Sequence, residues 1–301
     1  MTYHNPVLLK ESVDGLSIKP EGIYVDVTFG GGGHSKLILS RLKSGKLFAF
    51  DQDKSANLNN IDNSEFTFIN ANFRYVKNFL RMHGVIKIDG LLADLGVSSH
   101  QFDVAERGFS IRFDGKLDMR MDTNSRLSAK DVVNDYTEME LANVFYRYGE
   151  LRNSRLIANR IVGARRIANI KTTAELIDVI GDLSLEKFRN KFLARVFQAI
   201  RIEVNDKIIA LEEMLLSAVE LLKPAGRLAV ISYHSLEDRL VKNLMKKGNF
   251  SGRVEKDFFG NSKRNLKEIN SKVIVASSDE IKLNSRARSA KLRIAEKIYE
   301  N

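Results

Sequence analysis

The chain of 301 residues contains no cysteine, and this absence removes several kinds of chemistry at once. Without thiols there is no disulfide bond, no thiolate metal site and no cysteine nucleophile. Only five histidines are present, and none belongs to a His-Glu-x-x-His motif. The sequence therefore does not indicate a zinc site, and we expect no bound metal.

Long apolar runs are missing as well. No stretch of the sequence is long and apolar enough for a transmembrane helix. Residues 1–6 lack the basic-then-apolar layout of a signal peptide. We therefore expect a cytoplasmic protein that has no membrane partner. A chain of this length can bury a substantial core and hold one large or two smaller domains. The sequence does not decide between a monomer and a homodimer.

The charge is strongly positive and unevenly distributed. The formal net charge is +10, and residues 239–301 contain 16 Lys and Arg against seven Asp and Glu. Nearly the whole surplus thus lies in the last fifth of the chain. Concentrated positive charge favours a polyanionic partner, most simply a nucleic acid. The alternative is a solvated basic tail that only improves solubility.

Four consecutive glycines, residues 30–33, are the most informative local feature. They follow the apolar run 23–27 and precede an amphipathic segment that begins at His34. Glycine allows positive φ angles and lets a ligand approach the main chain closely, and the N-terminus of a following helix offers unpaired N–H groups. The run therefore predicts a cofactor pocket, with a flexible surface turn as the alternative.

Two common phosphate-binding motifs do not fit this run. In the dinucleotide fingerprint G-x-G-x-x-G, the third glycine would fall on Ser35 or Lys36. In a P-loop, the last glycine would be followed by Lys and then Ser or Thr, whereas here it is followed by His34. The sequence thus favours a nucleoside ligand without a pyrophosphate.

Polar or aromatic residues follow three further predicted strands. Asp51 ends the strand 46–50, Phe73 comes shortly after the strand 65–69, and Asp94 ends the strand 89–93. Ligands bind at the carboxyl ends of parallel strands, and an acidic residue after the second strand accepts hydrogen bonds from ribose hydroxyls. Phe73 is placed to stack on a purine, although a core position is an equal alternative.

The order of elements predicts an α/β fold with a helical insertion. Residues 22–96 alternate strands and helices, which implies a parallel sheet covered by helices. Capping boxes at Thr137 and Thr172 then mark two helices. A long helical stretch is expected from about Arg195 to Leu222, followed by a fifth strand over 227–232. We predict an α/β core over 1–104 and 197–301 and a helical insertion over 105–196.

A nucleoside cofactor without a pyrophosphate site indicates S-adenosylmethionine. At this point the sequence resembles the RsmH (MraW) family of bacterial 16S rRNA cytosine-N4 methyltransferases. The motifs that carry the resemblance occur in the family's order over nearly the whole chain: TFGGGGHS at 28–35, LADLGVSS at 92–99, ERGFS at 106–110, LDMRMD at 117–122, FQAIRI at 197–202, SLEDR at 235–239 and RARSA at 286–290.

The resemblance implies a Rossmann-like S-adenosylmethionine-dependent methyltransferase fold with an inserted α-helical domain that recognises the substrate. It implies methyl transfer to the exocyclic amine of one cytidine in the decoding region, so that the partner is 16S rRNA or the small ribosomal subunit. Matching positions suggest the cofactor contacts, namely Gly32, Gly33, His34, Asp51, Phe73, Asp94 and Gln101. Of these, His34 and Gln101 rest on the resemblance alone.

The catalytic residues are less well defined. Asp94, Asp118 and His234 are candidates, because acceptors for the amine protons would favour a pyramidal nitrogen. Tyr233 and His234 offer stacking or proton acceptance, or else they are packed structural residues. Asp118 and Asp122 enter the pocket from the insertion, or else they pair with Arg120 on the surface.

Other functions remain as alternatives. A nicotinamide-dependent dehydrogenase is disfavoured by the broken fingerprint and by the absence of a Tyr-x-x-x-Lys pair. A non-catalytic RNA-binding or assembly factor would keep the cofactor only as a ligand. A DNA methyltransferase is the nearest enzymatic rival, since positive charge does not distinguish RNA from DNA.

Overall fold

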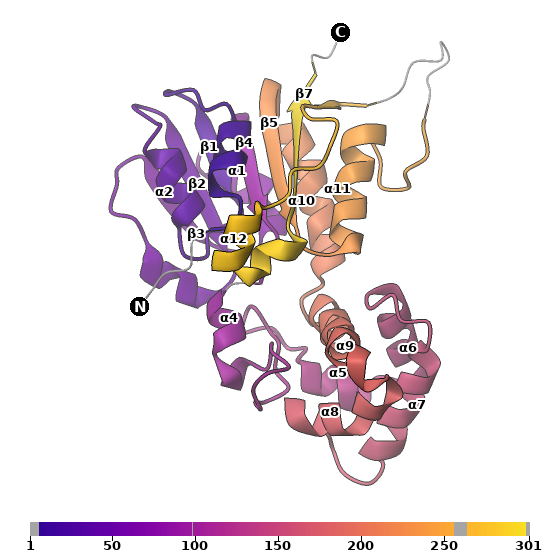
Figure 1. Cartoon of the computed structure of the whole chain (residues 1–301). Helices are drawn as coiled ribbons and strands as arrows, with labels where there is room; N and C mark the ends of the chain where they lie inside the picture. The colour runs from indigo at the N-terminus through magenta and orange to yellow at the C-terminus, as the bar shows by residue number, and fades with distance from the viewer. Residues whose placement is uncertain (1–5, 98, 256–263, 299–301) are drawn as a thin grey trace. The chain divides into compact units, whose positions relative to one another are not determined.

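The computed structural model describes residues 6–97, 99–255 and 264–298. The chain divides into two compact units (Figure 1). The sheet unit comprises Met1–Gly96 and Ile209–Asn301, and the helical unit comprises Val97–Ile208. The predicted insertion, residues 105–196, lies inside the helical unit, which also takes in residues 97–104 and 197–208.

The sheet unit is built on one seven-stranded sheet with the order β3-β2-β1-β4-β5-β7-β6. The first five strands pair in parallel, whereas β7 is antiparallel to both β5 and β6. This arrangement confirms the predicted α/β class. The strands are β1 Ile23–Asp26, β2 Lys46–Asp51, β3 Phe66–Asn70, β4 Ile88–Asp94, β5 Leu222–Ser232, β6 Leu266–Glu268 and β7 Lys291–Lys297.

Alternating side chains of the central strands pack into two apolar layers, one on each face of the sheet. Val25 and Leu91 belong to the layer that α3, α10 and α11 cover, whereas Tyr24 and Leu92 belong to the layer that α1 and α2 cover. Such strands are buried on both faces, so they are apolar almost throughout. The helices of this unit are α1 Leu9–Gly15, α2 Gly33–Leu39, α3 Val76–Met82, α10 Lys207–Leu221, α11 Ser235–Lys247 and α12 Ser278–Leu283.

The helical unit has its own core, formed among others by Phe145, Ile157 and Phe197. Both predicted capping boxes are present, with Thr137 and Thr172 each accepting the backbone N–H three residues on. Its helices are α4 Ser99–Asp103, α5 Ala129–Asp135, α6 Glu138–Arg147, α7 Ser154–Arg165, α8 Thr173–Ile180 and α9 Arg189–Val204.

The helical stretch expected from about Arg195 to Leu222 is helical but consists of two helices, α9 and α10, with a break that the sequence did not predict. The break lies at Asn205 and Asp206, and Asp206 has a φ of 48°. The Asn205 side chain donates to the carbonyl of Met119 at 2.8 Å and accepts the backbone N–H of Met121 at 2.7 Å. This local pairing offers the chain an alternative to a continuous helix.

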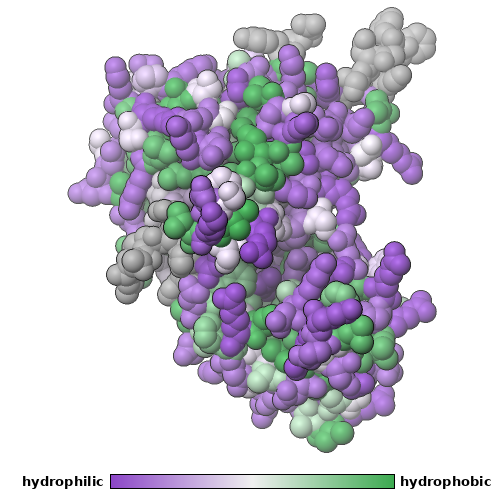
Figure 2. Space-filling view, viewed as in Figure 1, coloured by the Kyte–Doolittle hydropathy of each residue, from purple (hydrophilic) through white to green (hydrophobic). Residues whose placement is uncertain are grey.

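Hydrophilic side chains cover most of the face that Figure 2 shows, with smaller apolar groups between them. None of the described helices is long and apolar enough to cross a membrane.

We expect Phe50→Ala to lower the free energy of unfolding by about 3–5 kcal/mol, because it leaves a cavity in the core. Phe50 on β2 is fully buried, and its ring centroid lies 6.2 Å from that of Phe79. Urea denaturation followed by circular dichroism measures the effect. Leu58→Ala is the control, since Leu58 is 89% exposed; equal losses in both variants would contradict this assignment of the core.

Candidate functional site

The glycine run forms a tight corner between β1 and α2. Gly30 and Gly32 have φ angles of 51° and 74°, and α2 begins at Gly33. A Cβ atom on Gly32 would lie 2.9 Å from the ring of Phe29, so a side chain there would both strain the backbone and collide. The corner therefore presents bare main chain at the carboxyl end of β1, where a ligand can approach it.

A buried carboxylate that the sequence analysis did not single out holds this corner in place. Asp26, the last residue of β1, is 1% exposed. It accepts the backbone N–H of Thr28 at 3.1 Å and the hydroxyl of Ser35 at 2.7 Å. Burial raises the pKa of Asp26, while the nearby His34 and these hydrogen bonds oppose that rise. The available signal was an acidic residue that ends an apolar strand directly before the glycines.

Asp51 ends β2, the neighbouring strand, and points to the same corner. Its carboxylate accepts the N–H of Gly30 at 2.8 Å and that of Asp53 at 2.9 Å. A carboxylate has about four lone-pair positions, so two remain for a ligand with a pair of hydroxyl donors. Burial raises the pKa of Asp51 to about 6, against the two backbone hydrogen bonds that lower it.

The loops after β2 and β3 are tied together. Asn72 donates to the side-chain oxygen of Gln52 at 2.6 Å, and its own oxygen accepts the N–H of Arg74. Phe73 between them is half-buried against the sheet's main core. It thus has a packing role, and part of its ring stays accessible at the strand end.

Asp94 ends β4 and is bonded to the same corner. Its N–H donates to the hydroxyl oxygen of Thr28 at 2.6 Å, and its side chain is hydrogen-bonded to the Tyr233 hydroxyl that follows β5. Burial raises the pKa of Asp94 and that of Tyr233. Tyr233 therefore stays a phenol and donates. Its ring lies against Gly96, where a Cβ would meet it at 3.0 Å.

The two candidate histidines differ in their surroundings. His34 lies in the first turn of α2, is 5% exposed, and has Nε2 3.2 Å from the carbonyl oxygen of Val7. His234 caps α11, with Nδ1 accepting the N–H of Glu237 at 3.4 Å. Its Nε2 lies 2.9 Å from a carboxylate oxygen of Glu237. Both nitrogens of His234 thus face the start of α11.

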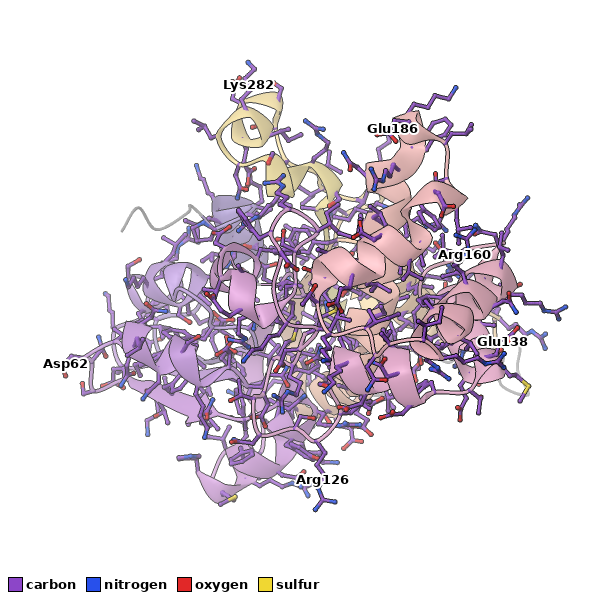
Figure 3. All side chains as sticks on the ribbon, turned by 90° about the horizontal axis from the view of Figure 1, so that it is seen from below. Asp62, Arg126, Glu138, Arg160, Glu186 and Lys282 are labelled. Atoms are coloured by element: carbon purple, nitrogen blue, oxygen red, sulfur yellow. The ribbon has the colours of Figure 1, made fainter. Side chains whose placement is uncertain are left out.

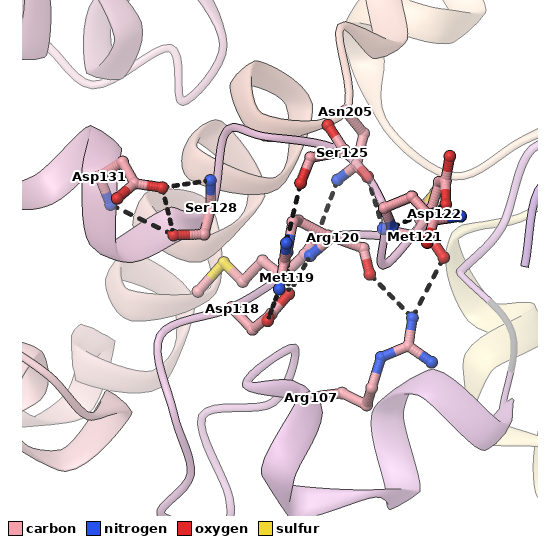
Figure 4. Close-up of polar contacts among 11 residues, drawn as sticks. Arg107, Asp118, Met119, Arg120, Met121, Asp122, Ser125, Ser128, Asp131 and Asn205 are labelled. Carbon is pink, nitrogen blue, oxygen red and sulfur yellow. Dashed lines mark hydrogen bonds and ion pairs between the residues drawn. The ribbon is translucent and has the colours of Figure 1, made fainter.

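Two other predicted site residues belong to the helical unit. Gln101 lies on α4 with its side chain buried. Asp118 pairs with Arg120, whose Nε and Nη2 donate to its two oxygens at 2.9 and 2.7 Å (Figure 4). Burial tends to raise the pKa of Asp118, but the hydrogen bonds from Arg120 hold it below its usual value. Roles for both at a cofactor or substrate stay predictions.

The sheet unit thus gathers a bare glycine corner and three carboxylates, Asp26, Asp51 and Asp94, at the carboxyl ends of adjacent strands. This arrangement suits a nucleoside whose hydroxyls donate to Asp51, and its negative charge suits a cationic group. Among the described residues, no group of three or more His, Cys, Asp or Glu side chains is arranged to hold a metal ion.

We expect Gly32→Ala to destabilise the protein by about 2–4 kcal/mol, from the left-handed backbone and the collision with Phe29 together. Gly84→Ala is a matched control, because Gly84 has the same φ of 74° and nothing within 4 Å of a Cβ. It isolates the backbone cost alone. Thermal unfolding of the two variants measures the difference, and equal shifts would contradict close packing at the corner.

Comparisons with known proteins show the family to which the chain belongs. The model of the MraW methylase family matches residues 1–298. A curated protein of Phocaeicola vulgatus, named Ribosomal RNA small subunit methyltransferase H, is 60% identical over 98% of this chain and 97% of its own length. A protein of the same name from Flavobacterium johnsoniae is 60% identical over 99% of each chain. A solved rRNA methylase from Streptococcus thermophilus aligns over 99% of each chain, with 12% identity and a TM-score of 0.45.

The match to a methylase family confirms S-adenosylmethionine as the expected cofactor. It also confirms the resemblance that the motifs indicated. With a family model that spans nearly the whole chain and relatives at 60% identity, the chain belongs to the MraW methylase family.

Proposed function

We propose that the chain methylates the exocyclic N4 amine of one cytidine in the decoding region of 16S rRNA. The observation that supports this most directly is the set of relatives at 60% identity that are named as methyltransferases of small-subunit ribosomal RNA. The choice of base and atom follows from the motif resemblance. The absence of cysteine also favours it, because methylation at a cytosine ring carbon commonly uses a thiolate that adds to the ring.

The proposed cofactor contacts lie at the carboxyl end of the sheet. Asp51 would accept hydrogen bonds from the ribose hydroxyls, and the partly exposed ring of Phe73 would stack on the adenine. Gly32 and Gly33 bring main chain against the methionine portion. The Asp94 carboxylate would accept hydrogen bonds from its ammonium group, and His34, which lies near Asp94, would contact the same portion. Gln101 remains a contact proposed from the resemblance.

When bound, S-adenosylmethionine supplies an electrophilic methyl group on a sulfonium. The cytosine amine is a weak nucleophile, because its lone pair is delocalised into the ring. An oxygen that accepts its N–H protons would favour a pyramidal nitrogen. The nitrogen lone pair would form the new N–C bond as the bond between the methyl group and sulfur breaks, and the accepting oxygen would take up the proton that leaves the nitrogen. Alignment of the nitrogen with the methyl group supplies the rest of the rate enhancement.

Among the three catalytic candidates we favour Asp94 as this acceptor. It ends a strand within the proposed cofactor site, and the Tyr233 hydroxyl orients its carboxylate. Asp118 is instead held by Arg120, and both nitrogens of His234 face Glu237.

Cofactor affinity should depend on pH through Asp51. Its pKa is raised to about 6, and only its ionised form accepts both ribose hydroxyls while it keeps its two backbone hydrogen bonds. Affinity is therefore full above pH 6 and should fall by about tenfold per pH unit below it, as the proton must first leave. Isothermal titration with S-adenosylmethionine between pH 5 and pH 8 measures this. Asp51→Asn should bind weakly and without this pH step; a variant that keeps the step would contradict the role of Asp51.

Incubation with tritiated S-adenosylmethionine and small-subunit rRNA should label a single cytidine, and mass spectrometry should place the methyl group on N4. Asp94→Asn should lower kcat by about 100-fold or more, while the exposed control Asp62→Asn (Figure 3) should leave it unchanged. Free rRNA, assembled subunits and assembly intermediates are tested separately. Absence of transfer to all three, methylation of another atom, or equal transfer to DNA would overturn the proposal.

A further inference from the structure

The helical unit contains a cavity of about 350 Å³ that the proposed reaction does not use. This volume is at the lower end of the roughly 300–1,000 Å³ of ligand pockets, but the lining is charged and Leu117 is its single aliphatic member. The lining residues are Lys116, Leu117, Asp118, Arg120, Arg126, Ser128, Lys130, Asp131 and Lys171. Such a lining suits a charged ligand.

Backbone hydrogen bonds hold three separate segments together around this cavity. The N–H of Leu117 donates to the carbonyl of Lys171 at 3.0 Å, and the carbonyl of Leu117 accepts the N–H of Lys130 at 2.7 Å. Lys130 and Lys171, which are far apart in the sequence, are thus bonded to one and the same residue. The backbone that frames the cavity is therefore held in place by the fold.

Both acidic residues of the lining are already engaged. Asp118 forms the two-bond pair with Arg120, whose Nη1 also donates to the carbonyl of Ser125 at 2.8 Å (Figure 4). Asp131 accepts the N–H and the hydroxyl of Ser128 at 2.8 and 2.6 Å in a capping box. Their negative charge is thereby largely compensated within the wall.

Four exposed cations of the lining have no acidic partner in the part of the chain that the structure describes: Lys116, Arg126, Lys130 and Lys171. Figure 3 shows Arg126 pointing away from the ribbon into solvent. By contrast, some cations of the basic C-terminal stretch have an acidic partner. Arg293 donates to Asp238 at 2.7 Å, with Lys291 3.4 Å from the same carboxylate. The helical unit thus has unpaired positive charge gathered around a single cavity.

We propose that this cavity binds backbone phosphate groups of the RNA substrate, an inference that rests on the proposed function. Unpaired Lys and Arg side chains are the groups that contact phosphate oxygens in RNA complexes, and such contacts fix the register of the strand and do not read its sequence. The cavity would thus bind the RNA strand through its backbone and leave the choice of base to other residues.

The test compares two double variants that lose the same charge. Lys130→Gln with Lys171→Gln removes two cations of the cavity. Arg155→Gln with Arg166→Gln removes two exposed arginines outside it, on α7 and at its C-cap, which have no acidic partner among residues 6–97, 99–255 and 264–298. Binding to a 16S rRNA fragment is measured by filter retention over a series of salt concentrations. The cavity variant should lose about tenfold in affinity at 0.1 M salt, and its slope of log K against log salt should fall by about 1 to 2. The α7 control should lose far less.

Further readouts separate the possible failures. Binding of S-adenosylmethionine and the circular dichroism spectrum should be unchanged in both variants. Equal losses in the two variants, or no loss in either, would overturn the cavity as an RNA site. The proposal would also be overturned if inorganic phosphate or adenosine monophosphate bound tightly and required Lys130, while the affinity for RNA did not depend on Lys130. The site would then take a free phosphorylated molecule. If the wild type binds RNA through the cavity but transfers no methyl group, the proposed function fails and this inference stands.

Discussion

The buried carboxylate of Asp26 is the interaction on which the rest of the site depends. It holds the Thr28 backbone and the Ser35 hydroxyl, so it joins the end of β1 to the first turn of α2. Thr28 in turn accepts the N–H of Asp94, which brings in the end of β4. A buried charge is costly unless hydrogen bonds compensate it. Here these hydrogen bonds also hold the glycine corner in one backbone conformation. Glycines alone would not, because their backbone is the least restricted.

The two units carry opposite electrostatic features, and each suits a different ligand. The sheet unit gathers Asp26, Asp51 and Asp94 at neighbouring strand ends, which favours a cofactor that bears positive charge. The helical unit surrounds a cavity with unpaired cations, which favours a polyanion. In the sheet unit, backbone hydrogen bonds to Asp26 and Asp51 hold the carboxylates in place, so little side-chain order has to be gained there on binding.

Much of the site was predictable because it follows local rules. Strand ends can be recognised from apolar runs, and parallel strands place their carboxyl ends at one edge, so Asp51 and Asp94 could be grouped from the sequence alone. Capping boxes at Thr137 and Thr172 are equally local. The break between α9 and α10 was missed, because the Asn205 side chain bonds to Met119 and Met121, which are distant in the sequence.

The sequence by itself determined the fold class, the position of the cofactor corner and the family, since all three depend on periodicity and on short motifs. Only the tertiary structure decided which charges are free. The basic surplus of residues 239–301 is partly neutralised by pairs such as Arg293 with Asp238, while Lys130 and Lys171 meet at Leu117. Net charge can be counted along a chain, but a charge can attract a partner only if no neighbour in space has already compensated it.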